Sequence, residues 1–456
     1  MIKNLFFIIV FVFINTTRSE ETTPKCEKLF PTSQVPTTFK HIGLLNTKEE
    51  LDIIKRNIEA GNEPWKTAFE KVKTSRWCRM DYIPHPVEIV SSDLYGANDH
   101  GAAAETDDSV AAYGDALLWY FTGNQKYAEK SVQIINAWSS ILQTHKGMNW
   151  YLQTAWAGST FPEAAEILRA TFPQWRIEDK KQFSLMLNRA FLPLLHNRVS
   201  FGNRELSVCN ALVAIGVYNN DRAAFYEGIC HWISYVPCYY YLSEDGLKPR
   251  ASDYWRTTPS DGLLAKLDAN LFPEPDKAWF MVKFVSPGED FYIRGAALDK
   301  IWFNPNIYID GLCAETCRDF THCENGFAAA INVAEIAWHQ GIDLYSIHQK
   351  RLTRYMEFNN SLRLGKPIPN GLHEGKLDFA GMSPTFEIAY NHYHNRKKIE
   401  LPSTHDYLIK GIRLMKNISF AAPQGIKAKF SHPLVSCNPA WETLTHAELD
   451  ADQTRK

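Results

Sequence analysis

One pattern recurs three times along the chain and constrains the fold more than any other feature. In each copy, an alanine-bearing stretch with apolar residues at helical spacing is followed by a short polar turn and a second helical stretch, which has an aromatic residue near its start. The copies span 109–142, 205–235 and 327–356 and begin at uneven intervals. Helices joined by so short a turn pack antiparallel, and several such hairpins stack into a solenoid, a bundle or a closed toroid.

Other stretches add helices, a loop and a cleft rim to this pattern. Apolar spacing predicts a long helix over 175–195 and another over 383–395. Residues 84–108 lack periodicity and carry several acidic side chains, so we expect a polar loop with a functional role. The Gly/Pro-rich residues 362–384 predict the rim of a cleft. Residues 243–309 mix Pro, Gly, Asp and aromatic residues and fit no single regular pattern.

The N-terminal residues have the composition of a secretory signal. A lysine near the start precedes ten apolar residues over 5–14, and small residues follow before residue 20. The apolar run is short for a transmembrane span, which leaves an uncleaved anchor as the alternative. We therefore expect residues 1–19 to be a signal peptide, the mature protein to be extracellular and not membrane-bound, and residues 20–40, rich in Thr and Pro, to form an extended arm.

The net charge and the cysteines indicate which partners and which covalent modifications to expect. A formal net charge of −2 with no long basic run argues against a nucleic-acid partner. Nine cysteines follow the signal, and in an oxidising compartment we expect some of them to form disulfides, with at least one left over. Their spacing does not match a zinc site. Sequons at Asn359 and Asn417 predict N-glycosylation.

Groups that handle protons and anions are concentrated at the start of the third hairpin. They run straight into a small, apolar helical stretch, which would place them on a rigid element. The alternative interpretation is a salt network that joins one helix end to the next. The residues are Glu315, Arg318, Asp319, His322 and Glu324.

Five separated motifs resemble the alginate-lyase-domain family of polysaccharide lyases. They occur in order between about residues 42 and 396, behind an opening IGLLNTKEELDII. The resemblance implies an all-α fold, an (α/α) toroid or incomplete barrel of helical hairpins, with 41–420 as the catalytic domain and 421–456 as a C-terminal extension. The motifs are NWYLQTAWAGSTFPEAAEILR (149–169), FGNRELSVCNALVAIGVYNNDRAAF (201–225), ETCRDFTHCENG (315–326), AWHQGIDLYS (337–346) and EIAYNHYHNR (387–396).

The resemblance also implies a secreted lyase that cleaves uronic-acid polysaccharides, alginate or glucuronan, by β-elimination. Such chemistry needs a partner for the uronate carboxylate, a base for the C5 proton and an acid for the leaving O4. Asn203 falls where the family has its neutralising Asn, Arg204 where some relatives have His, and Arg318 where they have an active-site Arg. The alternatives are a helix N-cap for Asn203 and a pair with Glu315 or Asp319 for Arg318.

The resemblance identifies the base and the acid less directly than the partners of the uronate carboxylate. His322 is the expected base, but relatives often carry a Tyr shortly after the Arg, where this chain has His-Cys-Glu. We therefore expect the acid to be Tyr393, with Tyr390, Tyr254 and Tyr308 as alternatives. The expected substrate-binding residues are Arg204, Trp150, Gln153, Glu324, Tyr254 and His392, with core packing as the alternative for Trp150 and Trp156.

No cofactor and no metal are expected. The acidic residues within 93–108 could bind Ca²⁺, but they lack the spacing of an EF-hand loop. His392 and His394 would diverge on a helix, which argues against a metal enzyme. The expected partner is an anionic polysaccharide.

Two other functions remain open at this point. An α/α-barrel glycoside hydrolase would need two carboxylates that flank the scissile bond. A non-catalytic carbohydrate-binding relative would keep the fold without turnover. The candidate carboxylates for hydrolysis are Glu315, Asp319 and Glu324, with Asp107, Asp108 or Glu374 as the second.

Overall fold

The computed structural model describes most of the chain. The described residues are 27, 30–93, 99–196, 200–252, 256–258, 279–286, 289–379, 386–413, 434–435, 438–439 and 441–449. The expected signal peptide, Tyr254 and the sequon at Asn417 lie outside them.

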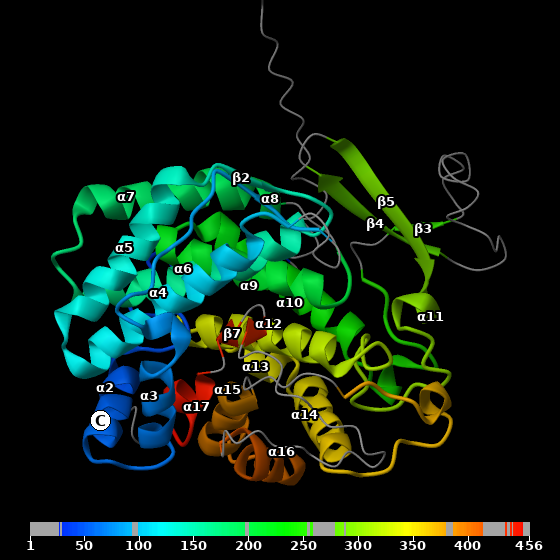
Figure 1. Ribbon diagram of the computed structural model, residues 1–456. Helices are drawn as coiled ribbons and strands as arrows, with labels where there is room; N and C mark the ends of the chain where they lie inside the picture. The colour runs from blue at the N-terminus through cyan, green and yellow to red at the C-terminus, as the bar shows by residue number, and fades with distance from the viewer. Residues whose placement is uncertain are drawn as a thin grey trace, which may run out of the picture.

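The described chain is mainly helical, as Figure 1 shows. The α-helices are α2 (Lys48–Glu59), α3 (Trp65–Lys73), α4 (Ala102–Thr122), α5 (Gln125–Ile141), α6 (Trp150–Thr171), α7 (Ile177–Met186), α8 (Leu192–Leu195), α9 (Asn203–Asn219), α10 (Arg222–Tyr239), α11 (Leu298–Ile301), α12 (Phe320–His339), α13 (Leu344–Ile347), α14 (Gln349–Arg363), α15 (Phe386–Tyr390), α16 (Pro402–Tyr407) and α17 (Glu442–His446). The three predicted hairpins correspond to α4–α5, α9–α10 and α12 with α13–α14.

The helices pack in sequence around a ring. Along its inner layer α4 packs on α6, α6 on α9, and α9 on α12, while α5 and α10 pack outside α4 and α9. From α12 the contacts continue through α15 and α17 to α3, which packs on α4. The inner helices are buried on nearly all sides, as expected for helices enclosed by two neighbouring layers. The predicted all-α toroid is confirmed.

The polar turns between paired helices both end one helix and begin the next. Gly123 ends α4 with φ of 67°, and the Asn124 side chain then accepts from the Lys126 backbone amide at 3.2 Å. Asn220 ends α9 with φ of 55°, and the Asp221 carboxylate accepts from Ala223 and its neighbour in the first turn of α10. These short turns hold each pair antiparallel.

The predicted polar loop 84–108 is shorter than expected. Helix α4 begins at Ala102, because Gly101 takes a left-handed conformation with φ of 74° and a run of alanines follows. Asp108 therefore lies on a helix, where it accepts from the Trp138 indole and the Tyr82 hydroxyl, each at 2.6 Å. Before this helix, β1 (Ile89–Ser91) pairs in parallel with β2 (Thr144–Lys146).

A β-sheet occupies part of the stretch that fitted no pattern. Strands β3 (Arg256–Thr258), β4 (Trp279–Ser286) and β5 (Glu289–Ala297) form an antiparallel sheet in that order. The sequence of β4, WFMVKFVS, is rich in the aromatic and β-branched residues that favour strands. A second, short pair joins β6 (Leu434–Val435) and β7 (Asn438–Pro439).

The predicted helix over 175–195 is present with an interruption. It consists of α7, a π-helical turn over Leu187–Phe191, and α8. Pro193 has no amide proton to donate to the carbonyl four residues earlier, which accounts for the local change of hydrogen-bond pattern. Similar π-helical turns follow α15 at Asn391–Arg396 and α16 at Leu408–Ile412.

Both ends of the described chain pack into the toroid. In the predicted arm, the Phe39 ring lies 4.8 Å from Phe225 of α10, and the Arg222 guanidinium donates to the Val35 carbonyl at 3.0 Å. Near the C-terminus, Trp441 and neighbouring apolar residues are buried in the core around α4. Among the described residues, no helix combines the length and apolar character that crossing a membrane requires.

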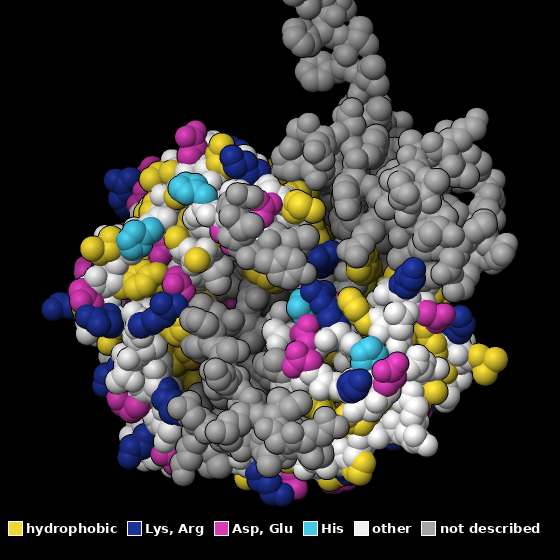
Figure 2. Space-filling model, turned by 45° about the vertical axis from the view of Figure 1, so that its right-hand side comes forward, with side chains coloured by type: hydrophobic (Ala, Val, Ile, Leu, Met, Phe, Trp, Pro, Cys, Tyr) yellow, Lys and Arg dark blue, Asp and Glu magenta, His cyan; other side chains and the backbone are white. Residues whose placement is uncertain are grey.

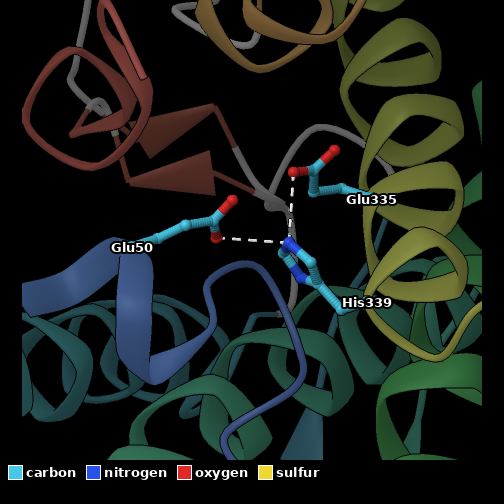
Figure 3. Close-up of side chains that lie close together, drawn as sticks. All are labelled: Glu50, Glu335 and His339. Carbon is cyan, nitrogen blue, oxygen red and sulfur yellow. Dashed lines mark ion pairs between the residues drawn. The ribbon is translucent and has the colours of Figure 1, made fainter. Parts of the chain in front are cut away.

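A buried ionic cluster of Glu50, Glu335, His339 and Arg396 joins the beginning, the middle and the end of the toroid. His339 Nε2 lies 3.2 Å from Glu50 of α2 and 3.3 Å from Glu335, which is also on α12 (Figure 3). Arg396 Nη2 lies 2.7 Å from Glu50 and 2.8 Å from Glu335. We call these four residues the closing cluster.

The closing cluster is balanced in charge. His339 Nδ1 donates to the Leu44 carbonyl at 2.6 Å, so Nε2 must also carry a proton to attract the two carboxylates. Burial lowers the pKa of His339, but the charges of Glu50 and Glu335 outweigh it and raise the pKa to about 10. Glu50, Glu335 and His339 are the one group among the described residues spaced like metal ligands. In this structure the two carboxylates are paired with His339 and Arg396.

We expect His339→Gln to lower the free energy of unfolding by about 3–5 kcal/mol below pH 6.5, because it leaves buried carboxylates short of one cation. A raised histidine pKa stabilises the fold fully below the ordinary value of 6.5, and this contribution is lost as the pH rises to about 10. The difference between wild type and variant should therefore shrink across that range in denaturant titrations. Lys48→Ala, which removes an exposed pair on α2, is the control and should cost about 0.5 kcal/mol or less at any of these pH values.

Candidate functional site

Two of the residues predicted to act together, Asn203 and Arg318, meet at one buried carboxylate, that of Glu315. Its Oε2 accepts from the Asn203 backbone amide at 2.7 Å, from Asn203 Nδ2 at 3.0 Å and from the Tyr239 hydroxyl at 2.9 Å. Its Oε1 accepts from Arg318 Nη1 at 3.1 Å. Glu315 is only 2% exposed. We call Asn203, Tyr239, Glu315 and Arg318 the Glu315 cluster.

The backbone around Gly202 allows this approach. Gly202 has φ of 68°, and a Cβ at this position would lie 3.0 Å from the Glu315 carboxyl carbon. Helix α9 begins at the next residue, and its first backbone amide, that of Asn203, donates to the carboxylate. The FGN sequence thus places a helix N-terminus against Glu315.

Asp319 and His322 form a second pair at the start of α12. Asp319 is the N-cap residue: its carboxylate accepts from the His322 backbone amide at 2.8 Å and also contacts His322 Nδ1 at 2.6 Å. Burial raises the pKa of Asp319, but the hydrogen bonds and charge of His322 outweigh it and lower the pKa. In the neutral form of the ring, Nδ1–H donates to Asp319 and Nε2 carries the lone pair; none of the described residues bonds to Nε2.

Arg318 connects the two groups and is partly open to solvent. Its side chain and that of His322 are each 30% exposed. The Arg318 guanidinium is held by Glu315, by an ion pair of 3.7 Å with Asp319, and by the Phe303 ring at 5.4 Å. The rest of the guanidinium can take a ligand carboxylate. Figure 2 shows basic, acidic and histidine side chains together on one wall of a hollow in the molecular surface.

Arg204, which follows Asn203 in the sequence, is a second cation near the Glu315 cluster. Its guanidinium carbon lies 5.6 Å from the ring centres of both Tyr151 and Phe201, within the range of cation–π attraction. Tyr151 belongs to a small apolar cluster at the start of α6 that includes Trp150. This stacking holds the half-buried Arg204 against an aromatic surface.

Asn203 and Arg318 both bond to Glu315, as neighbours in one site. The Asn203 side chain, however, does not face a substrate as predicted. The side chain is 1% exposed and its amide faces Glu315, so it does not offer a donor to solvent. It is also not an N-cap, since that position belongs to Gly202 and Asn203 is the first residue of α9. The structure therefore makes Asn203 a partner of Glu315, behind the partly exposed Arg318.

The predicted acid and a predicted binding residue lie in the core instead. Tyr393 is fully buried and its hydroxyl donates to the Tyr345 carbonyl at 3.1 Å. The His392 ring stacks on Tyr345 at 3.7 Å, and burial lowers the pKa of His392 to about 3. Tyr390 stacks on His394. The segment EIAYNHYHNR thus packs the helical layer, and its two expected site residues do not join the Glu315 cluster.

Three further predicted binding residues are also buried in contacts within the protein. Gln153 donates to Glu105 at 2.8 Å and to a backbone carbonyl, both inside the core. Trp150 is 2% exposed, which agrees with the core-packing alternative. Glu324 is buried in an ion pair with Arg363. Of the alternative acids, Tyr308 donates to Asp299 at 2.7 Å, and Tyr254 lies outside the described residues.

The described positions with a predicted covalent modification, the sequon at Asn359 and the cysteines, are buried. Asn359 is buried in α14, where its amide donates to the Tyr355 hydroxyl at 3.0 Å, so the folded chain does not expose this sequon. Five of the described cysteines are buried thiols outside any disulfide: Cys78, Cys209, Cys313, Cys317 and Cys323. Disulfide pairing remains a prediction.

Tyr239 is the member of the Glu315 cluster that the sequence did not reveal. It lies at the end of α10 in a run of three tyrosines, and its partner is 76 residues away in the chain. Its only local signal is that run, which favours core packing as much as a site. Periodicity places Tyr239 on a helix but not opposite Glu315.

Comparisons with known proteins give a likeness of fold. No family model matches the chain, and no curated protein matches it. Among solved structures, alginate lyase A1-III from Sphingomonas species A1 is 14% identical with a TM-score of 0.41, covering 68% of this chain and 78% of that one. The apo form of a variant of A1-III is 13% identical with a TM-score of 0.45, covering 77% and 88%. An alginate lyase from Bacteroides ovatus is 12% identical with a TM-score of 0.42, covering 72% and 85%. No residue role is taken from these similarities.

Asp319 both caps α12 and contacts the His322 ring, and substitution tests the cap. We expect Asp319→Ala to lower the free energy of unfolding by about 1 kcal/mol, because α12 loses its N-cap. Asp319→Asn keeps a capping oxygen and should retain most of that stability. Chemical denaturation measures both, and equal losses in the two variants would contradict the assignment of the cap.

Proposed function

We propose that this chain is a polysaccharide lyase that cleaves uronic-acid polymers, alginate or glucuronan, by β-elimination, and that it is secreted. One observation carries the proposal: a partly exposed guanidinium, Arg318, and a histidine with a free Nε2, His322, lie beside each other on a rigid wall. An arginine suits a sugar carboxylate and a neutral imidazole suits proton abstraction. The motifs shared with the alginate-lyase-domain family support the same chemistry.

In the proposed reaction Arg318 binds the carboxylate of the uronate to be cleaved. Pairing this carboxylate stabilises the negative charge that develops as C5 loses its proton. The guanidinium is already oriented by Glu315 and Asp319, so little reorganisation is needed when substrate arrives. Arg204 binds the carboxylate of a neighbouring sugar along the polymer.

His322 transfers the proton. Its Nε2 takes the proton from C5, the C4–O4 bond breaks, and a C4=C5 double bond forms. The imidazolium, stabilised by Asp319, then gives the proton to the leaving O4. One residue can serve as both base and acid when the C5 proton and O4 lie on the same face of the sugar, which removes the need for a separate tyrosine.

The hydrolase alternative receives less support. The carboxylates it would use are occupied: Glu315 by its cluster, Asp319 by His322, and Glu324 by Arg363. On α4, Asp107 accepts from the Trp77 indole and Asp108 from that of Trp138. Glu374 is well exposed, but it lacks a second free carboxylate among the candidates to act with it.

Incubation of the purified protein with polymannuronate, polyguluronate and glucuronan tests the proposal. A lyase leaves an unsaturated uronate, so ultraviolet absorbance rises as new chain ends form. New reducing ends without that rise would identify a hydrolase. The absence of both, with the polymer still bound, would identify a binding protein.

We expect Arg318→Ala and His322→Gln each to lower kcat/KM at least about 100-fold, because each removes a group that acts in the transition state. Glu387→Gln is the matched control: Glu387 is a buried carboxylate paired with Arg413 on another part of the toroid. It should change stability but leave kcat/KM of the folded enzyme near wild type. Full activity in His322→Gln would remove His322 from the mechanism.

Arg204→Gln separates binding from catalysis. If Arg204 binds a sugar next to the cleaved bond, the substitution should raise KM for long polymers by about tenfold and leave kcat nearly unchanged. Steady-state kinetics on polymer and on short oligomers checks this, and the shortest substrates should be least affected. A loss confined to kcat would instead assign Arg204 to the reacting sugar.

A further inference from the structure

We infer that Glu315 is the positioning residue of the site: its carboxylate sets the orientation of Arg318, and it does not touch the substrate. The inference rests on the proposed function and deepens it. Glu315 is buried, whereas Arg318, which it contacts through Nη1, is partly exposed. Its effect on the reaction therefore passes through the guanidinium.

The donors around Glu315 come from separate elements and converge on one acceptor. Asn203 contributes from the start of α9, Tyr239 from the end of α10, and Arg318 from the turn that precedes α12. A carboxylate is the side chain that can accept from all of them at once, since it has two oxygens and no proton to donate. An amide in its place would turn an NH₂ group toward at least one donor.

The backbone around Glu315 leaves room for its carboxyl group and holds Arg318 beside it. Gly202 has no side chain where the Glu315 carboxyl group lies, and a Cβ there would be only 3.0 Å from the carboxyl carbon. Glu315 and Arg318 also lie in one turn, in which the Arg318 backbone amide donates to the Glu315 carbonyl at 2.9 Å. Backbone and side chain thus hold Arg318 in the same direction.

The test removes the Glu315 carboxylate by substitution and then supplies a carboxylate as free formate. We expect Glu315→Gln to lower kcat/KM about 100-fold, mostly in kcat, because a misplaced guanidinium binds substrate but fits the transition state poorly. Glu315→Ala should lose as much activity and regain several-fold when formate is added, since formate supplies the missing acceptor. Formamide has a similar shape but carries donors, and it should not restore activity. Glu387→Ala, treated in the same way, is the control and should show no formate effect on kcat.

A second readout does not depend on turnover. Formate should raise the Tm of Glu315→Ala more than that of wild type, because it occupies the donors left by the substitution. If the wild-type chain cleaves no polyuronate, the proposed function fails, while this Tm shift still tests the placement of the donors. If Glu315→Ala does not fold, Glu315→Asp replaces it, and its kcat should fall with KM nearly unchanged. Wild-type kcat in any folded variant, or no formate effect on either readout, overturns the inference.

Discussion

The Glu315 carboxylate collects hydrogen bonds from three parts of the chain that lie far apart in sequence. Asn203 is the first residue of α9, Tyr239 is the last residue of α10, and Arg318 lies just before α12. Without this acceptor the buried amide groups of Asn203 would lose their partner, and each unsatisfied group would cost about 1–3 kcal/mol. The proposed site exists because one buried anion holds these elements at a common point and leaves one face of Arg318 open.

The toroid supplies the frame in which this convergence is possible. Helices α9 and α12 are neighbours in its inner layer, so their N-terminal ends can meet. The closing cluster performs a comparable task on the opposite end of α12, where Glu335 and His339 bond to elements from both ends of the chain. One helix therefore carries the proposed chemistry at its start and the closure of the ring at its end. The two ionic groups differ in that the closing cluster is almost wholly buried and balanced, whereas the site leaves its cation partly exposed.

The sequence predicted those parts of the structure that depend on local pattern. The hairpins followed from helical periodicity and turn residues, and the concentration of reactive groups on 315–324 followed from composition. The meeting of Asn203 and Arg318 was predicted from motif resemblance, but the direction of the Asn203 side chain was not, because it depends on Glu315 more than 100 residues away. For the same reason Tyr239 was missed. Tyr393 and His392 lie on a segment whose pattern of aromatic residues also fits a core helix, and the structure buries both.

The most direct test of the account is a crystal structure of the His322→Gln variant with a uronate oligosaccharide. The account predicts that one sugar carboxylate pairs with Arg318 and that its C5 lies about 3–3.5 Å from the position of residue 322, as a near-attack geometry requires. Glu315 should keep its bonds to Asn203 and Tyr239 in that complex. An oligosaccharide whose carboxylates all bind elsewhere, or a C5 that faces away from residue 322, would contradict it.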